Sequence, residues 1–193
     1  MLFRSLAGVI FHELAHQRLY IADDSKFNEA FATAVEQIGT RRWLDRHGDE
    51  TDREAYAEQV AHREAFLALV THYRGELQAL YTSDLESAEK HQRKAQTFAA
   101  MRGDYAAMAR GWPAPKAYEA FFGEGLNNAR LIAVATYFDW VPAFERLFDQ
   151  SGGDIERFYA RSEALGRLSR AQRASKMTEL MGGASVPKSG NDH

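Results

Sequence analysis

The sequence predicts a mainly α-helical protein, and two observations support this prediction. Only 4 prolines interrupt the 193 residues, and no stretch alternates apolar and polar residues over the length of a strand. Apolar residues instead recur at steps of three and four, the spacing that places them on one face of a helix. With 45% hydrophobic residues the chain can bury a substantial core, and we expect one domain over residues 1–182.

Two helices are expected at the start of the chain. The first covers about residues 5–20, with Leu6 and Val9 among its apolar positions. The second begins at Ser25, a residue type that caps helix N-termini, and continues towards Trp43.

A long helical hairpin is expected over residues 51–110, which are rich in Ala, Glu, Gln and Arg. Residues 83–86 read Ser-Asp-Leu-Glu and have the form of a capping box, so the region divides there into two helices. Such a pattern usually indicates a structural scaffold. The clearest turn of the sequence follows at residues 111–115.

In the last part of the chain, the sequence predicts shorter helices and a polar tail. The expected helices lie near residues 126–138, 142–150, 154–165 and 170–181. The tail, residues 183–193, is small and polar, and we expect it to be disordered.

Composition excludes several classes of function. Lys and Arg total 24 against 27 for Asp and Glu, so the chain lacks the positive charge that collects nucleic acid. The absence of cysteine excludes disulfides and thiolate zinc sites. Residues 1–11 are apolar but run directly into a histidine without a small-residue cleavage site, so we expect neither a signal peptide nor a transmembrane segment there.

The residues that indicate chemistry are His12-Glu13-Leu14-Ala15-His16, an HExxH motif inside the first expected helix. The four-residue step returns to nearly the same helix face, so both imidazoles can hold one metal ion. Glu13 lies beside that face, where its carboxylate can act as general base towards a metal-activated water. The alternative is a pair of histidines hydrogen-bonded to neighbouring groups.

The second expected helix offers acidic partners for this motif. An open zinc site needs one more protein ligand, which Glu29 can supply. Glu36 lies seven residues later on nearly the same face, where it can accept a hydrogen bond from a ligating histidine. The alternatives are a first-turn glutamate favoured by the helix dipole for Glu29, and a solvated side chain for Glu36.

The sequence resembles the bacterial putative aminopeptidase family. The resemblance rests on residues 11–17 (FHELAHQ) and 27–32 (FNEAFA), and it extends to the following positions: residues 35–36, residues 126–129, Tyr137 and residues 141–142. The Asn-Glu pair followed by a later acidic residue also resembles the third-ligand helix of gluzincin aminopeptidases. The resemblance implies a zincin-like fold, one zinc ion and a peptide substrate.

The resemblance also implies roles for residues of the later segments. Gluzincins supply a Tyr or His that donates to the developing oxyanion, and Tyr137 is the candidate. A core tyrosine is the alternative. Asn127 and Asn128 can hold a substrate backbone or cap the helix that begins there.

Zincin-like folds place a β-sheet before the HExxH helix, and no segment here reads as that sheet. We therefore expect the chain to be the C-terminal part of a longer protein. Relatives in this family resemble exported or periplasmic lipoproteins. Two rival functions stay open: a non-enzymatic metal-binding or interaction module, and a zinc hydrolase of another amide or ester. Retention of a base beside two histidines favours an enzyme.

Overall fold

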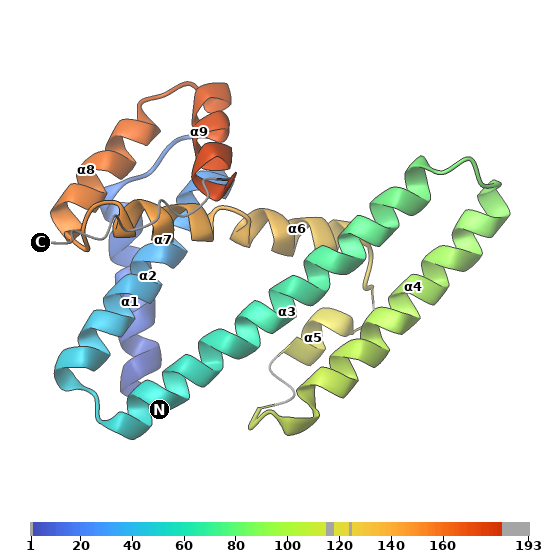
Figure 1. Cartoon of the computed structure of the whole chain (residues 1–193), viewed down its shortest axis with the longest axis horizontal. Helices are drawn as coiled ribbons and strands as arrows, with labels where there is room; N and C mark the ends of the chain where they lie inside the picture. The colour runs from blue at the N-terminus through green and yellow to red at the C-terminus, as the bar shows by residue number, and fades with distance from the viewer. Residues whose placement is uncertain (1, 115–117, 124, 183–193) are drawn as a thin grey trace, which may run out of the picture. The chain divides into compact units, whose positions relative to one another are not determined.

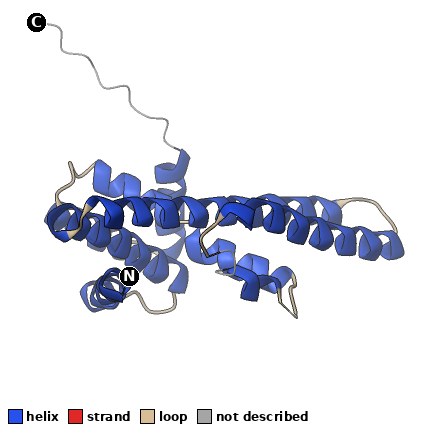
Figure 2. Ribbon diagram, turned by 90° about the horizontal axis from the view of Figure 1, so that it is seen from below, coloured by secondary structure: helices blue, strands red, loops and turns tan. Residues whose placement is uncertain are grey.

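The structure, a computed structural model, describes residues 2–114, 118–123 and 125–182, without the side chains of residues 2–5 and 135–137. These residues form helices and loops and contain no strand, which confirms the mainly α prediction (Figures 1 and 2). The chain divides into two compact units, Met1–Trp43 with Asp139–His193, and Leu44–Phe138. One domain over residues 1–182 and a zincin-like fold stay predictions, and the tail at residues 183–193 lies outside the described residues.

The first unit contains both expected N-terminal helices and the last three of the chain. Their bounds lie within a few residues of the predicted ones: α1 Leu2–Arg18, α2 Ser25–His47, α7 Val141–Asp149, α8 Ile155–Gly166 and α9 Arg170–Gly182. The N-cap of α2 is a correction. Asp24, and not Ser25, accepts the hydrogen bond from the N–H of Phe27, because α2 already begins at Ser25.

Helix α2 lies at the centre of this unit, because its buried apolar side chains point to several sides. Phe27, Phe31 and Ile38 are fully buried along it. The ring of Phe31 packs edge-on against Phe144 of α7, at 5.6 Å between centroids, and stacks with Phe158 of α8, at 5.9 Å. Such burial all round is typical of a helix enclosed by other elements.

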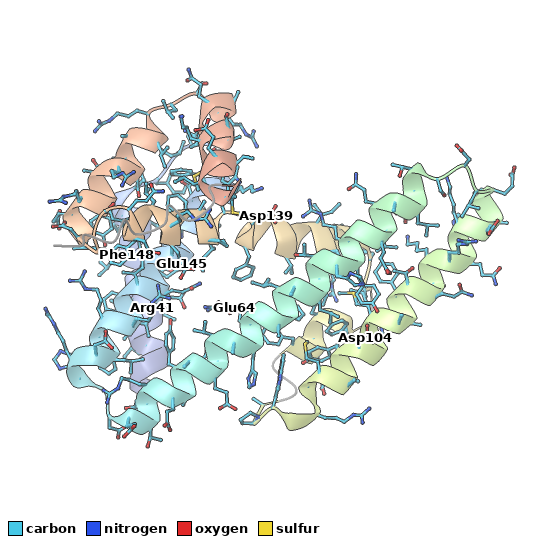
Figure 3. All side chains as sticks on the ribbon, viewed as in Figure 1. Arg41, Glu64, Asp104, Asp139, Glu145 and Phe148 are labelled. Carbon is cyan, nitrogen blue, oxygen red and sulfur yellow. The ribbon has the colours of Figure 1, made fainter. Side chains whose placement is uncertain are left out.

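Ion pairs at the surface of the first unit join α2 to the segment that returns from the second unit. Lys26 binds the Asp139 carboxylate at 3.0 Å and lies over the Trp140 ring. Arg41 and Glu145, labelled in Figure 3, pair at 3.0 Å. Half-buried pairs of this kind near the surface contribute little stability each, so the aromatic core holds most of the unit together.

The second unit is built on the predicted hairpin. Its helices are α3 Glu50–Thr82, α4 Ser87–Met108, the short α5 Glu119–Phe122 and α6 Asn128–Phe138, with a 3-10 turn at Ala109–Gly111. α3 packs against both α4 and α6. Their shared core includes Phe66, Val70, Met101 and Leu131.

The predicted capping box at residues 83–86 is wrong, although the chain does divide there into two helices. Ser83 ends α3, and its hydroxyl donates to the carbonyl of Leu80 at 2.7 Å. Glu86 is the N-cap of α4 and makes no side-chain cap hydrogen bond. The Ser83 hydroxyl therefore binds the C-terminal end of α3 and does not cap the N-terminus of α4.

Helix α1 presents apolar side chains outward. Val9 and Leu14 are each 58% exposed, and Leu6 is 55% exposed. None of the helices in the described part of the chain is long and apolar enough to cross a membrane.

A hydrogen bond from Tyr73 of α3 to the Asp104 carboxylate of α4 gives the hairpin a testable pH dependence. The two oxygens lie 2.6 Å apart (Asp104 is labelled in Figure 3). This bond, together with burial and the charges of Asp104 and Glu76, raises the pKa of the Tyr73 hydroxyl from 10.0 to about 12. We expect Tyr73→Phe to lower the free energy of unfolding by about 1 kcal/mol at pH 7. Because the raised pKa belongs to the folded state, this difference should shrink as pH rises from 10 towards 12.

Urea unfolding of both proteins at pH 7 and pH 11 measures this difference. A gap between wild type and variant that is equally wide at the two pH values contradicts the assignment.

Candidate metal centre

The short loop between α1 and α2 brings the two helices together as an antiparallel pair. The Asn28 side chain is 2% exposed and bonds the backbone of Ile21 twice, accepting from its N–H at 2.8 Å and donating to its carbonyl at 2.7 Å. Asp23, just before α2, has a positive φ of 61°, which turns the chain sharply. The loop is therefore tied to the first turn of α2.

A glycine of α2 lets the pair pack closely. A Cβ at Gly39 of α2 would lie 2.8 Å from the Phe11 ring of α1, which is closer than van der Waals contact. A Cβ at Gly8 of α1 would lie 3.4 Å from Oε1 of Glu36. A side chain at Gly39 would separate the helices, so the absence of one there sets their spacing, whereas a Cβ at Gly8 would make only ordinary van der Waals contact.

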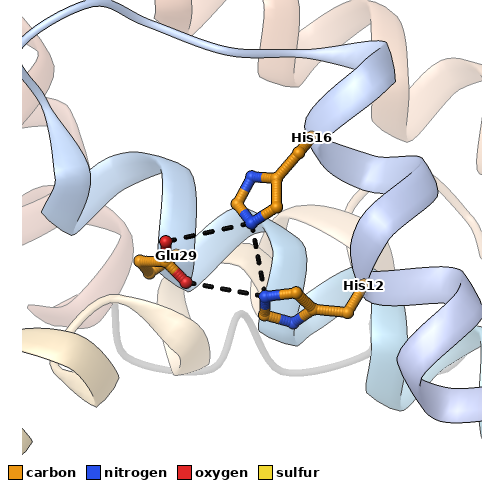
Figure 4. Close-up of side chains that lie close together, drawn as sticks. All are labelled: His12, His16 and Glu29. Atoms are coloured by element: carbon orange, nitrogen blue, oxygen red, sulfur yellow. Dashed lines mark hydrogen bonds and ion pairs between the residues drawn. The ribbon is translucent and has the colours of Figure 1, made fainter.

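His12, His16 and Glu29 converge between the two helices (Figure 4). The Nε2 atoms of the histidines lie 3.3 Å apart. Nε2 of His12 is 3.5 Å from Oε2 of Glu29, and Nε2 of His16 is 3.8 Å from Oε1. All three side chains are half-buried, with 18%, 19% and 29% exposure, so small molecules can reach them.

Two of these separations, 3.3 Å and 3.5 Å, suit a tetrahedral metal ion, and the third, 3.8 Å to the other carboxylate oxygen, is slightly wider. Ligand bonds of about 2.0–2.2 Å at tetrahedral angles hold the ligand atoms about 3.3–3.6 Å apart. Two imidazoles and one carboxylate are also the donor types that zinc takes. The residues present therefore fit a zinc ion with three protein ligands.

Glu36 of α2 contacts the other ring nitrogen of His12. Its Oε2 is 3.3 Å from Nδ1 of His12. A carboxylate only accepts, so a neutral His12 carries its proton on Nδ1 and leaves the Nε2 lone pair facing His16 and Glu29. Nδ1 of His16 is buried and has no hydrogen-bond partner among the described residues.

Glu13, the proposed base, is exposed on α1. Asn127 and Asn128 belong to the second unit. Each makes a hydrogen bond within that unit, which gives it a structural role as an alternative to substrate binding. Asn127 caps α6, since its Oδ1 accepts from the N–H of Arg130 at 3.1 Å. Nδ2 of Asn128 donates to the Tyr81 hydroxyl at 2.8 Å.

The backbone of Tyr137 lies in α6, but its side chain is outside the described residues. Of the remaining histidines, His47, His72 and His91 are exposed, and His62 stacks on Trp112 with ring centroids 4.3 Å apart. Within the described ranges, no other cluster of His, Asp and Glu meets the geometry of a metal site.

The residues that hold α1 and α2 together were not predicted from the sequence. Asn28 entered the prediction only as part of the FNEAFA motif, and Gly8 and Gly39 had no part in it. A glycine inside an apolar helical pattern is a signal for close packing, which could have found Gly39.

Comparison with family models matched residues 3–177 to a family described as putative aminopeptidase. Comparison with curated proteins and with solved structures returned no match.

Two glycine substitutions should have opposite effects. Gly39→Ala should lower the free energy of unfolding by about 1–3 kcal/mol, because the new methyl group overlaps the Phe11 ring. Gly75 lies in mid-α3, where a Cβ would meet nothing within 4 Å, so Gly75→Ala should raise stability by up to about 1 kcal/mol. Thermal and urea unfolding of the two variants provide the comparison, and stabilisation by both would rule out close packing at Gly39.

Proposed function

Because the chain belongs to the putative aminopeptidase family, we propose that it is a zinc-dependent peptidase whose metal ligands are His12, His16 and Glu29. Membership of this family is consistent with peptidase activity. The observation that carries the zinc proposal is the convergence of two Nε2 atoms and a carboxylate within 3.8 Å of one another, close to tetrahedral ligand separations.

The proposed site is open, as catalysis requires. A structural zinc ion is usually held by four protein ligands, whereas a catalytic one keeps a position for water or substrate. Three residues form the cluster within the described residues. When bound there, zinc would polarise the scissile carbonyl and activate water.

Glu13 is the proposed general base. Its carboxylate would take a proton from the attacking water as the water oxygen bonds to the carbonyl carbon. The same carboxyl group would then give the proton to the departing amine as the carbon–nitrogen bond breaks. Its exposed position on α1 supports this role, because a proton carrier has to meet substrate.

Glu36 is proposed to orient His12 through the 3.3 Å contact with Nδ1. Tyr137 stays our candidate for the donor to the oxyanion, and Asn127 and Asn128 stay candidates for substrate binding.

A metal-binding module without activity is the rival function, and a zinc hydrolase of another amide or ester is the third candidate. A purely structural site would gain nothing from an exposed glutamate between its histidine ligands. Zinc content measured together with cleavage of a peptide library separates these functions.

We expect the purified protein to bind about one zinc ion per chain. Glu29→Ala should weaken zinc binding by about 100-fold or more, since even outer partners of ligands contribute about 10–100-fold. Glu29 lies just beyond the first turn of α2, so Glu156→Ala, at an exposed glutamate in the first turn of α8, controls for the loss of a glutamate near a helix N-terminus away from the cluster. Competition with a zinc chelator measures both affinities, and equal affinities would remove Glu29 from the ligand set.

Glu13→Gln should retain zinc and lose most hydrolysis, by about 10²–10⁴-fold in kcat, because the amide cannot accept the proton. Glu156→Gln makes the same charge change on an exposed glutamate of the same unit and should leave kcat unaltered. Activity of the Glu13 variant within a few-fold of wild type would refute the mechanism.

A further inference from the structure

We propose that Arg173, in the C-terminal helix α9, is a positioning residue of the metal centre, because it holds the turn of α2 from which Glu29 extends. The proposal rests on the ligand set given above. It assigns a role at the site to a helix that contributes no ligand.

Arg173 forms a buried ion pair with Asp24, the cap of α2. Nε of Arg173 donates to Oδ2 of Asp24 at 2.8 Å, and the two residues are 4% and 3% exposed. Nη1 donates to the carbonyls of Gly166 and Leu168, each at 2.9 Å. The guanidinium group thus joins the start of α2 to the turn between α8 and α9.

The Asp24 end of this pair acts directly on the first turn of α2. Its Oδ1 accepts from the N–H of Phe27 at 3.3 Å, and its carbonyl accepts from the N–H of Asn28 at 3.1 Å. The guanidinium also lies over the Phe27 ring, 5.2 Å from its centroid. Glu29 is the next residue along the chain, so its backbone position follows from these contacts.

A second contact joins the same two segments. A Cβ on Gly166, at the end of α8, would lie 2.8 Å from Cδ1 of Ile21 in the α1–α2 loop. The Asn28 side chain binds both the backbone N–H and the carbonyl of Ile21. The α8–α9 turn therefore meets the loop and the cap of α2 together.

Removal of Arg173 would leave the Asp24 carboxylate buried without its cation. A buried charge that loses its partner is strongly unfavourable, so Asp24 would move towards water and release the N–H of Phe27. The first turn of α2 would then fray, and the Glu29 oxygens would leave their positions 3.5 Å and 3.8 Å from the histidine nitrogens. His12 and His16, both on α1, would keep their mutual geometry.

Metal binding by the full chain tests the proposal, with Zn²⁺ competition for affinity and the visible absorption of bound Co²⁺ for coordination. Arg173→Met should weaken Zn²⁺ binding by about 10–100-fold and alter the Co²⁺ spectrum. Arg173→Lys retains a cation for Asp24 and should recover part of the loss.

Arg146→Met is the matched control. Arg146 of α7 also donates to backbone carbonyls of the first unit, those of Leu180 and Met181 at the end of α9. Its loss should lower the melting temperature but leave Zn²⁺ affinity within ~3-fold of wild type.

The outcomes separate this proposal from the proposed function. Wild-type Zn²⁺ affinity in both Arg173 variants, or an equal loss in Arg146→Met, overturns the positioning role while the ligand set stands. A wild-type protein that binds neither metal ion overturns both. If Arg173→Met does not fold, Arg173→Lys and Asp24→Asn decide the question, because wild-type Zn²⁺ affinity in both of them overturns the positioning role.

Discussion

The close packing of α1 against α2 is the constraint on which the metal centre depends. The histidines come from α1 and both acidic partners come from α2, so every distance across the site follows from the spacing between these helices. That spacing is set where Gly39 meets the Phe11 ring. A cluster with nitrogens 3.3 Å apart and a carboxylate 3.5 Å away tolerates little displacement.

Helix α2 combines two tasks that usually conflict. Phe27 and Phe31 fill the aromatic core, while Glu29 and Glu36 face the histidines of α1. Carboxylates beside a core are unfavourable unless each has a partner. The imidazoles of α1 supply these partners, so the packing of the first unit and the chemistry of its site require the same arrangement of two helices.

The polar contacts around the start of α2 extend this arrangement to the rest of the unit. Asn28 binds the loop that precedes the helix, and Asp24 binds Arg173 from the far end of the chain. These groups are buried, so each needs its partner in place before the helix can adopt this position. The first turn of α2 therefore depends on segments more than a hundred residues away in sequence.

The sequence by itself determined the helical class, most helix positions and the cluster of His12, His16, Glu29 and Glu36. Those features depend on local periodicity and on helix arithmetic, which act over a few residues. The tertiary structure decided the two compact units, the cap at Asp24 in place of Ser25, the role of Ser83 and the contacts of Arg173. The two units and the contacts of Arg173 join residues that lie far apart along the chain, and no local pattern encodes such partners. The cap at Asp24 and the role of Ser83 are local contacts that depend on the residue at which each helix begins or ends.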